Sequence, residues 1–238
     1  MNTAPAEPEA RRRARQVQSG AARAAVLGVS DGLVTNVSLI LGVAGAQSSS
    51  KVVLLAGLAS LVAGAFSMAV GEYVSIAAQV ELLQNLLADF REQMRNAPED
   101  AREEIETFFA RGGVLQATAH NASKQISMIP DQALAVYARS LGFDPEELGS
   151  PWRSALSSLF TFAAGALVPL APWFFTSGSF ASVLSLGLGA GAALAVGGVL
   201  GYLGGRNIAW SATRQLIVLC LAAAATWGAG KLFNVTVA

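Results

Sequence analysis

Two carboxylates stand inside apolar stretches of the sequence, where acidic side chains are rare. Asp31 interrupts the run GVSDGLVTNVSLILGVAGA, and Glu72 interrupts the run AGAFSMAVGEYVSIAAQ. A charged side chain at the centre of a membrane-spanning helix costs roughly 2.5–3.5 kcal/mol, so such groups usually face other helices or water and serve a function. Met68 lies one helical turn before Glu72. Carboxylate oxygens suit hard or borderline divalent ions, and a thioether beside them slightly favours Fe²⁺ over Mg²⁺.

Both acids belong to series of small and polar residues that recur at helical spacing. In the first segment the series is Asp31, Thr35, Ser38, Gly42 and Gly45. In the second it is Ser60, Gly64, Ser67, Met68, Gly71, Glu72, Ser75 and Gln79. Each series forms one face of a helix, and such a face turns toward protein or water rather than lipid. Two interpretations stay open: a path for an ion between helices, or a seam along which helices pack closely.

The helices that carry these residues are expected to span a membrane. The chain of 238 residues is 53% hydrophobic and 13% charged, about half the charged fraction of a typical soluble domain. Apolar segments long enough to cross a hydrocarbon core of about 30 Å occur at residues 25–46, 52–74, 154–175, 180–203 and 212–233. We therefore predict an all-α polytopic membrane protein with five transmembrane helices.

The basic residues predict how these spans are oriented. Only Lys51 and Lys231 fall on one side of the predicted spans, and the arginines fall on the other. These arginines are Arg11, Arg12, Arg13, Arg15, Arg23, Arg153, Arg206 and Arg214. Because basic residues accumulate on the cytoplasmic side, we expect the N-terminus in the cytoplasm and the C-terminus on the opposite side. We interpret the run RRRAR as a topology signal that contacts anionic lipid, and we expect no nucleic-acid binding.

A polar block separates the second and third spans. Residues 81–152 hold 12 of the 16 acidic and 6 of the 16 basic residues. Helix starts are indicated at Pro98 and Pro130, and helix ends at Gly112–Gly113 and Gly142. We predict a cytosolic tail at residues 1–24, spans one and two at 25–80, a small cytosolic helical domain at 81–152, and spans three to five at 153–238.

The residue inventory argues against several other classes of function. One histidine, His120, and one cysteine, Cys220, cannot build a disulfide framework within one chain. Tight zinc or copper binding is not expected because neither residue lies near the acids. We find no paired nucleophile and base and no phosphate-binding loop, so we do not expect an enzyme or a cofactor.

These segments resemble the vacuolar iron transporter family. SDGLVTNVSLILGVAGA and AGAFSMAVGEYVSIAAQ are similar to its first two helices, and RNIAWSATRQLIVLCLAAAATWGAG is similar to its last. LGFDPEELGSPWRSALSSLFTFAAGALVPLAPW resembles its entry into the third helix. The resemblance implies a homodimer of five-helix subunits, with a pore at the dimer axis lined by the first helix and a cytosolic metal-binding domain. It implies export of Fe²⁺ or Mn²⁺ from the cytosol in exchange for protons. We expect a bacterial-type member in the bacterial inner membrane.

The resemblance also assigns metal-binding roles to residues. The family's pore aspartate falls on Asp31 and its pore methionine on Met68, whereas a pore glutamate of the family falls on Ser60 and is absent. Glu72 would partly replace its charge. A twin Asp31 from a second subunit would complete the ion site, and the two would hold protons until a divalent ion expels them.

The cytosolic metal site that the resemblance implies is depleted. One family E-x-x-E pair falls on Glu103 and Glu106, but a family glutamate falls on Ser140 and a family methionine near Val136. The alternative for these acids is a solvated acidic face. For the whole chain, the alternatives are a membrane scaffold or regulator that does not transport, and a carrier of another divalent cation.

Overall fold

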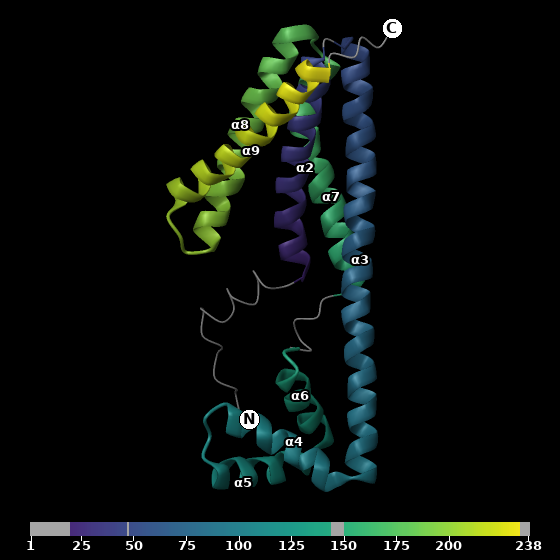
Figure 1. Cartoon of the computed structure of the whole chain (residues 1–238), viewed down its shortest axis with the longest axis vertical. Helices are drawn as coiled ribbons and strands as arrows, with labels where there is room; N and C mark the ends of the chain where they lie inside the picture. Colours follow the sequence, from purple (N-terminus) through teal and green to yellow (C-terminus); the bar gives the residue numbers. More distant parts are fainter. Residues whose placement is uncertain (1–19, 47, 144–149, 234–238) are drawn as a thin grey trace, which may run out of the picture. The chain divides into compact units, whose positions relative to one another are not determined.

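The computed structural model describes residues 20–46, 48–143 and 150–233, and every regular element in these ranges is a helix (Figure 1). In chain order the elements are α2 (Gly20–Gly45), α3 (Ser50–Asn96), α4 (Pro98–Arg111), α5 (Gln116–Ser127), α6 (Pro130–Ser140), α7 (Pro151–Leu170), the 3₁₀ helix η1 (Ala171–Phe174), α8 (Gly178–Leu203) and α9 (Ile208–Phe233). The predicted all-α fold is confirmed for the described residues. The arginines at residues 11–15, which we expect on the cytosolic side, lie outside the described residues.

The predicted membrane spans are confirmed as helices of sufficient length. Among the described residues, five helices are long and apolar enough to cross a membrane: α2, α3, α7, α8 and α9. Large apolar side chains cover their outer faces, and Leu55, Phe66, Phe160, Val183 and Leu221 are each more than 60% exposed. A soluble protein rarely exposes so much contiguous apolar surface, whereas a lipid bilayer covers it. The chain is therefore an integral, multi-pass membrane protein.

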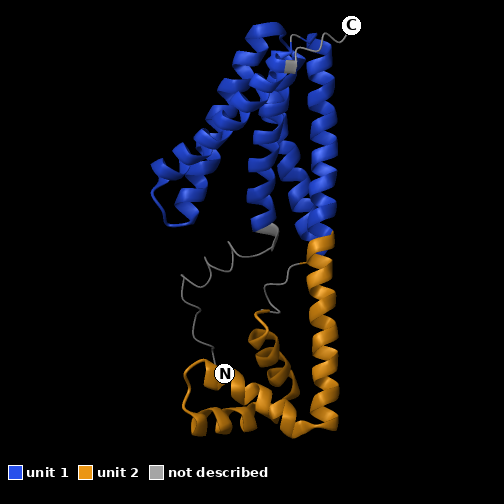
Figure 2. Cartoon of the chain, viewed as in Figure 1, with its two compact units in different colours: residues 1–73, 151–238 blue, residues 74–150 orange. Residues whose placement is uncertain are grey.

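The helices form two compact units, shown in Figure 2. Unit 1 consists of residues 1–73 and 151–238, and unit 2 of residues 74–150. The 47-residue helix α3 contributes its first half to unit 1 and its second half to unit 2.

In unit 1, glycines let α2 approach its neighbours closely. A Cβ atom added to Gly32 would overlap the carbonyl oxygen of Phe162 on α7, and one added to Gly165 would overlap the carbonyl oxygen of Val29. Gly230 of α9 lies in the same way against the backbone of Gly42. Close backbone approach through small residues is a common way for membrane helices to gain van der Waals packing.

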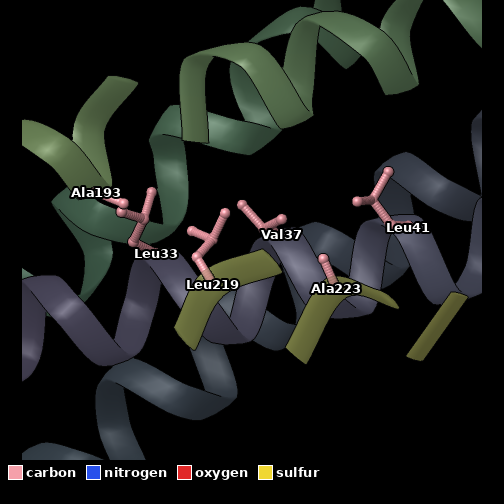
Figure 3. Close-up of a cluster of buried hydrophobic side chains, with 6 residues drawn as sticks. All are labelled: Leu33, Val37, Leu41, Ala193, Leu219 and Ala223. Atoms are coloured by element: carbon pink, nitrogen blue, oxygen red, sulfur yellow. The ribbon is translucent and has the colours of Figure 1, made fainter. Parts of the chain in front are cut away.

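Apolar clusters and one buried amide hold α2 among the other helices of unit 1. Figure 3 shows side chains of α2, α8 and α9 meeting in one cluster, which consists of Leu33, Val37, Leu41, Ala193, Leu219 and Ala223. Asn36, on α2, is fully buried, and its Nδ2 donates to the carbonyl oxygens of Ala166 at 2.9 Å and Gly57 at 3.4 Å. This amide therefore links α2 to both α7 and α3.

A buried chain of hydrogen bonds fixes the end of α7. The indole Nε1 of Trp173 donates to Ser185 Oγ at 2.8 Å, and Ser185 Oγ donates to the carbonyl oxygen of Pro169 at 2.6 Å. The last carbonyls of a helix lack donors within the helix, so Ser185 of α8 satisfies one of them. This arrangement ties α8 to the turn that follows α7.

In unit 2, α4, α5 and α6 surround a core with the second half of α3. The core contains Phe90, Ala101, Ile105, Ala133 and Leu134. Pro98 and Pro130 stand at the first helical positions of α4 and α6, as the sequence predicts, because a missing amide hydrogen is harmless there. Glycines with positive φ follow the two helices: Gly113 at 85° after α4 and Gly142 at 82° after α6.

Candidate metal-ion site

Asp31 is an exposed carboxylate near the middle of α2. Thr35, one turn further along the helix, donates its Oγ1 hydrogen to Asp31 Oδ1 at 3.1 Å. Among the described residues, no basic side chain forms an ion pair with Asp31. Gly28 and Gly32 pack against α7 on a neighbouring face of α2, and the Asp31 side chain itself is exposed. The carboxylate is thus available to a cation or to a second protein surface.

Met68 of α3 lies within about one helical turn of the level of Asp31 in unit 1. Phe162 shows this, because its backbone lies against Gly32 of α2 and its ring lies against Gly64 of α3. Met68 is half-buried and packs against the cluster of Ala65, Phe162 and Ala166. One aromatic residue of α7 therefore packs against both helices close to the thioether and the carboxylate.

Glu72 has a partner of its own. Arg23, near the start of α2, donates from Nη2 to Glu72 Oε1 at 3.2 Å. Arg23 lies about two helical turns before Asp31 on α2. Glu72, at the middle of α3, therefore lies nearer the start of α2 than Asp31 does, and it pairs with a residue of that first stretch of α2.

The small-residue faces divide into an open part and a packed part. Gly42 and Gly45 pack against Thr226 and Trp227 of α9, so this part of the α2 series is a packing seam. In the α3 series, by contrast, an added Cβ atom at Gly71 would meet only open space. The packing-seam interpretation therefore holds for Gly42 and Gly45, and the ion path stays a prediction for the half of unit 1 that contains Asp31, Met68 and Glu72.

Glu106 in unit 2 also binds a neighbour. Its Oε2 lies 2.9 Å from Nδ1 of His120, on α5, and the Glu106 side chain is only 18% exposed. The expectation that no histidine lies near the acids is wrong at this position. The turn between α4 and α5 brings together two residues that are 14 positions apart.

Glu103 faces a different neighbourhood from Glu106, although both are on α4. It lines a cavity of about 510 Å³ between α3, α4 and α6, with Asp100, Glu104, Arg111 and Ser140 among the other lining residues. The expected E-x-x-E pair is therefore split between the cavity and the contact with α5. Ser140, where the resembled family has a glutamate, donates its hydroxyl to the Tyr137 carbonyl oxygen at 2.7 Å.

The negative charge near this cavity affects Tyr137. Burial raises the pKa of its phenol above the ordinary value of 10.0, and the carboxylates of Glu104 and Asp89 raise it further. The ring of Tyr137 stacks on Phe90, with centroids 3.9 Å apart. Unit 2 therefore combines a packed aromatic core with a carboxylate-rich surface.

A single chain does not close a metal site in the part that the structure describes. No three side chains of the His, Cys, Asp and Glu types lie close enough together there to hold an ion. Sequence reasoning had counted Arg23 only as a topology charge, and it had no signal for the contact of His120 with Glu106. Phe162 carries no polar chemistry, so only packing reveals its place between Gly32 and Gly64.

Comparison with known proteins agrees with the resemblance. The description "VIT family" matches residues 22–231. The chain is 37% identical to "Vacuolar iron transporter homolog 1" of Oryza sativa subsp. japonica, over 89% of this chain and 73% of that protein. It is 34% identical to "Vacuolar iron transporter" of Acanthamoeba castellanii, over 90% and 79% of the two chains. A plant and an amoeba lend no support to the expected bacterial type. With a match that covers most of its length, the chain belongs to the VIT family.

Proposed function

We propose that this protein carries divalent iron or manganese across a membrane. The observation that carries the proposal is Asp31, an exposed carboxylate on a membrane-spanning helix that has a hydroxyl but no basic residue beside it among the described residues. Ionisable groups in such helices mark ion pathways by default. The relatives at 37% and 34% identity are named as iron transporters or their homologues, and not as enzymes.

The ion site is proposed to form between two copies of the chain. One Asp31 carboxylate with one Met68 thioether provides too few ligands for Fe²⁺ or Mn²⁺, which take several oxygen or nitrogen ligands. Two α2 helices that face each other across a two-fold axis would contribute both Asp31 side chains. The exposed side chain of Asp31 supports this arrangement.

Proton exchange follows from the same carboxylates. Metal ligands must be deprotonated, so a divalent ion that binds the two Asp31 side chains releases protons held there. Return of protons from the other side of the membrane would then release the ion. Thr35 is proposed to orient the carboxylate through its hydrogen bond of 3.1 Å.

The proposed direction of transport is out of the cytosol. Gly28 of α2 packs against Ser158 of α7, so Arg23 and Arg153 lie toward the same end of unit 1. Lys231 follows Gly230, which packs against Gly42 near the opposite end of α2. This distribution supports a cytosolic N-terminus under the positive-inside rule. Since α3 leaves unit 1 beyond Glu72, unit 2 would lie in the cytosol.

Unit 2 is proposed to gather cations at the entrance. Residues 74–150 contain 12 acidic and 6 basic residues, and clefts lined by one sign of charge raise the local concentration of counter-ions. A scaffold or regulator without transport activity is the second candidate. It is favoured by Ser60 and Ser140 at positions where the family has glutamates, and by the pairing of Glu106 with His120.

Flux measurements on the purified protein in liposomes test the proposal. The vesicles would contain a metal-sensitive dye and a pH-sensitive dye, and Mn²⁺ or Fe²⁺ would be added outside with Co²⁺ and Zn²⁺ as competitors. For molecules whose cytosolic side faces outward, we expect metal uptake with a rise of internal pH. Uptake no faster than in protein-free vesicles would favour the scaffold.

A further inference from the structure

Among the described residues of unit 1, Arg23 and Glu72 form the only ion pair. Arg23 Nη2 and Glu72 Oε1 are 3.2 Å apart. The two side chains differ in exposure: 59% of Arg23 is accessible, but only 12% of Glu72. The carboxylate is therefore held among protein groups, and the guanidinium covers it from the open side.

The pair lies on the proposed ion path, nearer the start of α2 than Asp31 does. Glu72 is one helical turn from Met68 on α3, and Arg23 is about two turns before Asp31 on α2. A cation that enters from the arginine-rich end would reach Glu72 before it reaches Asp31 and Met68.

An aromatic contact lies next to Glu72 in the chain. Its neighbour Tyr73 packs against Trp152, next to the start of α7, with ring centroids 4.8 Å apart. This contact fixes α3 against α7 at the level of the ion pair. Arg23 has no such anchor among the described contacts and has a long, flexible side chain, so it is the partner that can move.

We infer that Arg23 is a removable cover on Glu72, which a divalent cation displaces on its way to Asp31 and Met68. The inference rests on the proposed transport function. Arginine keeps its charge at any physiological pH, so the cover opens by moving into water and not by losing a proton. Two positive charges on the arriving ion compete with one on the guanidinium for the same carboxylate.

The cover sets the apparent affinity of the carrier for its ion. A partly exposed ion pair changes a binding equilibrium by roughly 1.4- to 5-fold. Arg23 should therefore weaken the binding of the ion to Glu72 by that factor and still allow it. Removing the guanidinium should therefore lower the KM for Mn²⁺ and leave the maximal rate nearly unchanged. Removing the carboxylate should raise the KM and make the presence of Arg23 irrelevant.

The test compares initial rates of Mn²⁺ uptake into liposomes over a range of Mn²⁺ concentrations. The variants are Arg23→Gln, Arg23→Lys, Glu72→Gln, the double variant Arg23→Gln with Glu72→Gln, and Arg153→Gln. Arg153 is an exposed arginine near the start of α7 and serves as the matched control for loss of one positive charge. We expect Arg23→Gln to lower the KM by about 1.4- to 5-fold. Arg23→Lys and Arg153→Gln should keep the wild-type KM.

The double variant separates a cover from a merely structural residue. If Arg23 acts through Glu72, the substitution Arg23→Gln changes nothing once Glu72 is glutamine. An unchanged or higher KM in Arg23→Gln, or an equal decrease of the KM in the Glu72→Gln background, would overturn the inference. Absence of uptake by the wild-type protein would overturn the proposed function itself, and with it the inference, so the two failures are distinguishable.

Discussion

Gly32 on α2 lies directly against the backbone carbonyl of Phe162 on α7, with no room for a side chain at residue 32. The same Phe162 places its ring against Gly64 of α3 and packs near Met68. Since Asp31 precedes Gly32, one aromatic residue packs beside both proposed ion-binding side chains. The contact therefore joins helix packing to the proposed function.

Gly32→Ala should lower both stability and transport. The added methyl group would force α2 away from α7, and overpacking of this kind costs about 1–3 kcal/mol. The displacement would also shift Asp31 relative to Met68. Thermal unfolding in detergent and Mn²⁺ uptake in liposomes measure the two effects.

Gly191→Ala is the matched control for this substitution. Gly191 lies inside α8, is exposed, and has no atom within 4 Å of an added Cβ. Alanine there should leave the unfolding temperature unchanged or slightly higher, because glycine is the weaker helix former. Equal effects of the two alanines would show that the contact with Phe162 does not matter.

Asn36→Ala should destabilise unit 1 without removing a proposed ion ligand. The fully buried amide donates to carbonyl oxygens of α7 and α3, and interhelical hydrogen bonds in membranes contribute about 0.6–1.7 kcal/mol. The expected result is a lower unfolding temperature in detergent. Asn121→Ala, at an exposed position of α5, should leave that temperature unchanged, and an equal decrease for both would contradict the assigned role.

Glu103→Gln should raise the KM for Mn²⁺ more than it lowers the maximal rate. Glu103 lines the cavity of unit 2, where its charge is proposed to attract cations. Because this attraction acts through solvent, salt should weaken the difference between variant and wild type, as the screening length falls from about 10 Å at 0.1 M to about 3 Å at 1 M. Glu106→Gln should have a smaller effect on the KM, because Glu106 already binds His120. A salt-independent loss of maximal rate would contradict the attraction role.

Tyr137 should ionise above pH 10.0 in the folded protein. Burial raises the pKa of its phenol first, and the carboxylates of Glu104 and Asp89 add to the effect. The folded state thus holds this proton more tightly than the unfolded chain, so the stabilisation is complete below pH 10.0 and is lost as the pH rises through the folded pKa.

An absorbance titration of the phenolate measures this pKa. Tyr73→Phe and Tyr202→Phe would leave Tyr137 as the single tyrosine. Adding Glu104→Gln should lower the midpoint, because one negative neighbour is removed. A midpoint at or below 10.0 before that substitution would contradict the assigned environment.

Sequence patterns predicted the five spanning helices because hydropathy acts locally, and proline and glycine marked the starts and ends of α4 and α6 for the same reason. Asp31 could be singled out for the same reason, since a carboxylate in an apolar run needs no tertiary information. The periodicity of Gly42 and Gly45 identified a face of α2, but only the packing of α9 shows that this face is a seam. The contacts of Glu72 with Arg23 and of Glu106 with His120 depend on how distant helix positions meet, which local patterns do not encode.

The most direct test of the central claim is metal flux through the Asp31→Asn variant. Purified wild type, Asp31→Asn and Asp131→Asn would be reconstituted at equal protein content, with Fe²⁺ or Mn²⁺ uptake and internal pH recorded together. Asp131 is an exposed acid in the first turn of α6 and controls for the chemical change. Loss of a metal ligand should reduce uptake by at least about tenfold in Asp31→Asn and remove the pH change, while Asp131→Asn behaves as wild type. Uptake by Asp31→Asn at the wild-type rate would contradict the account.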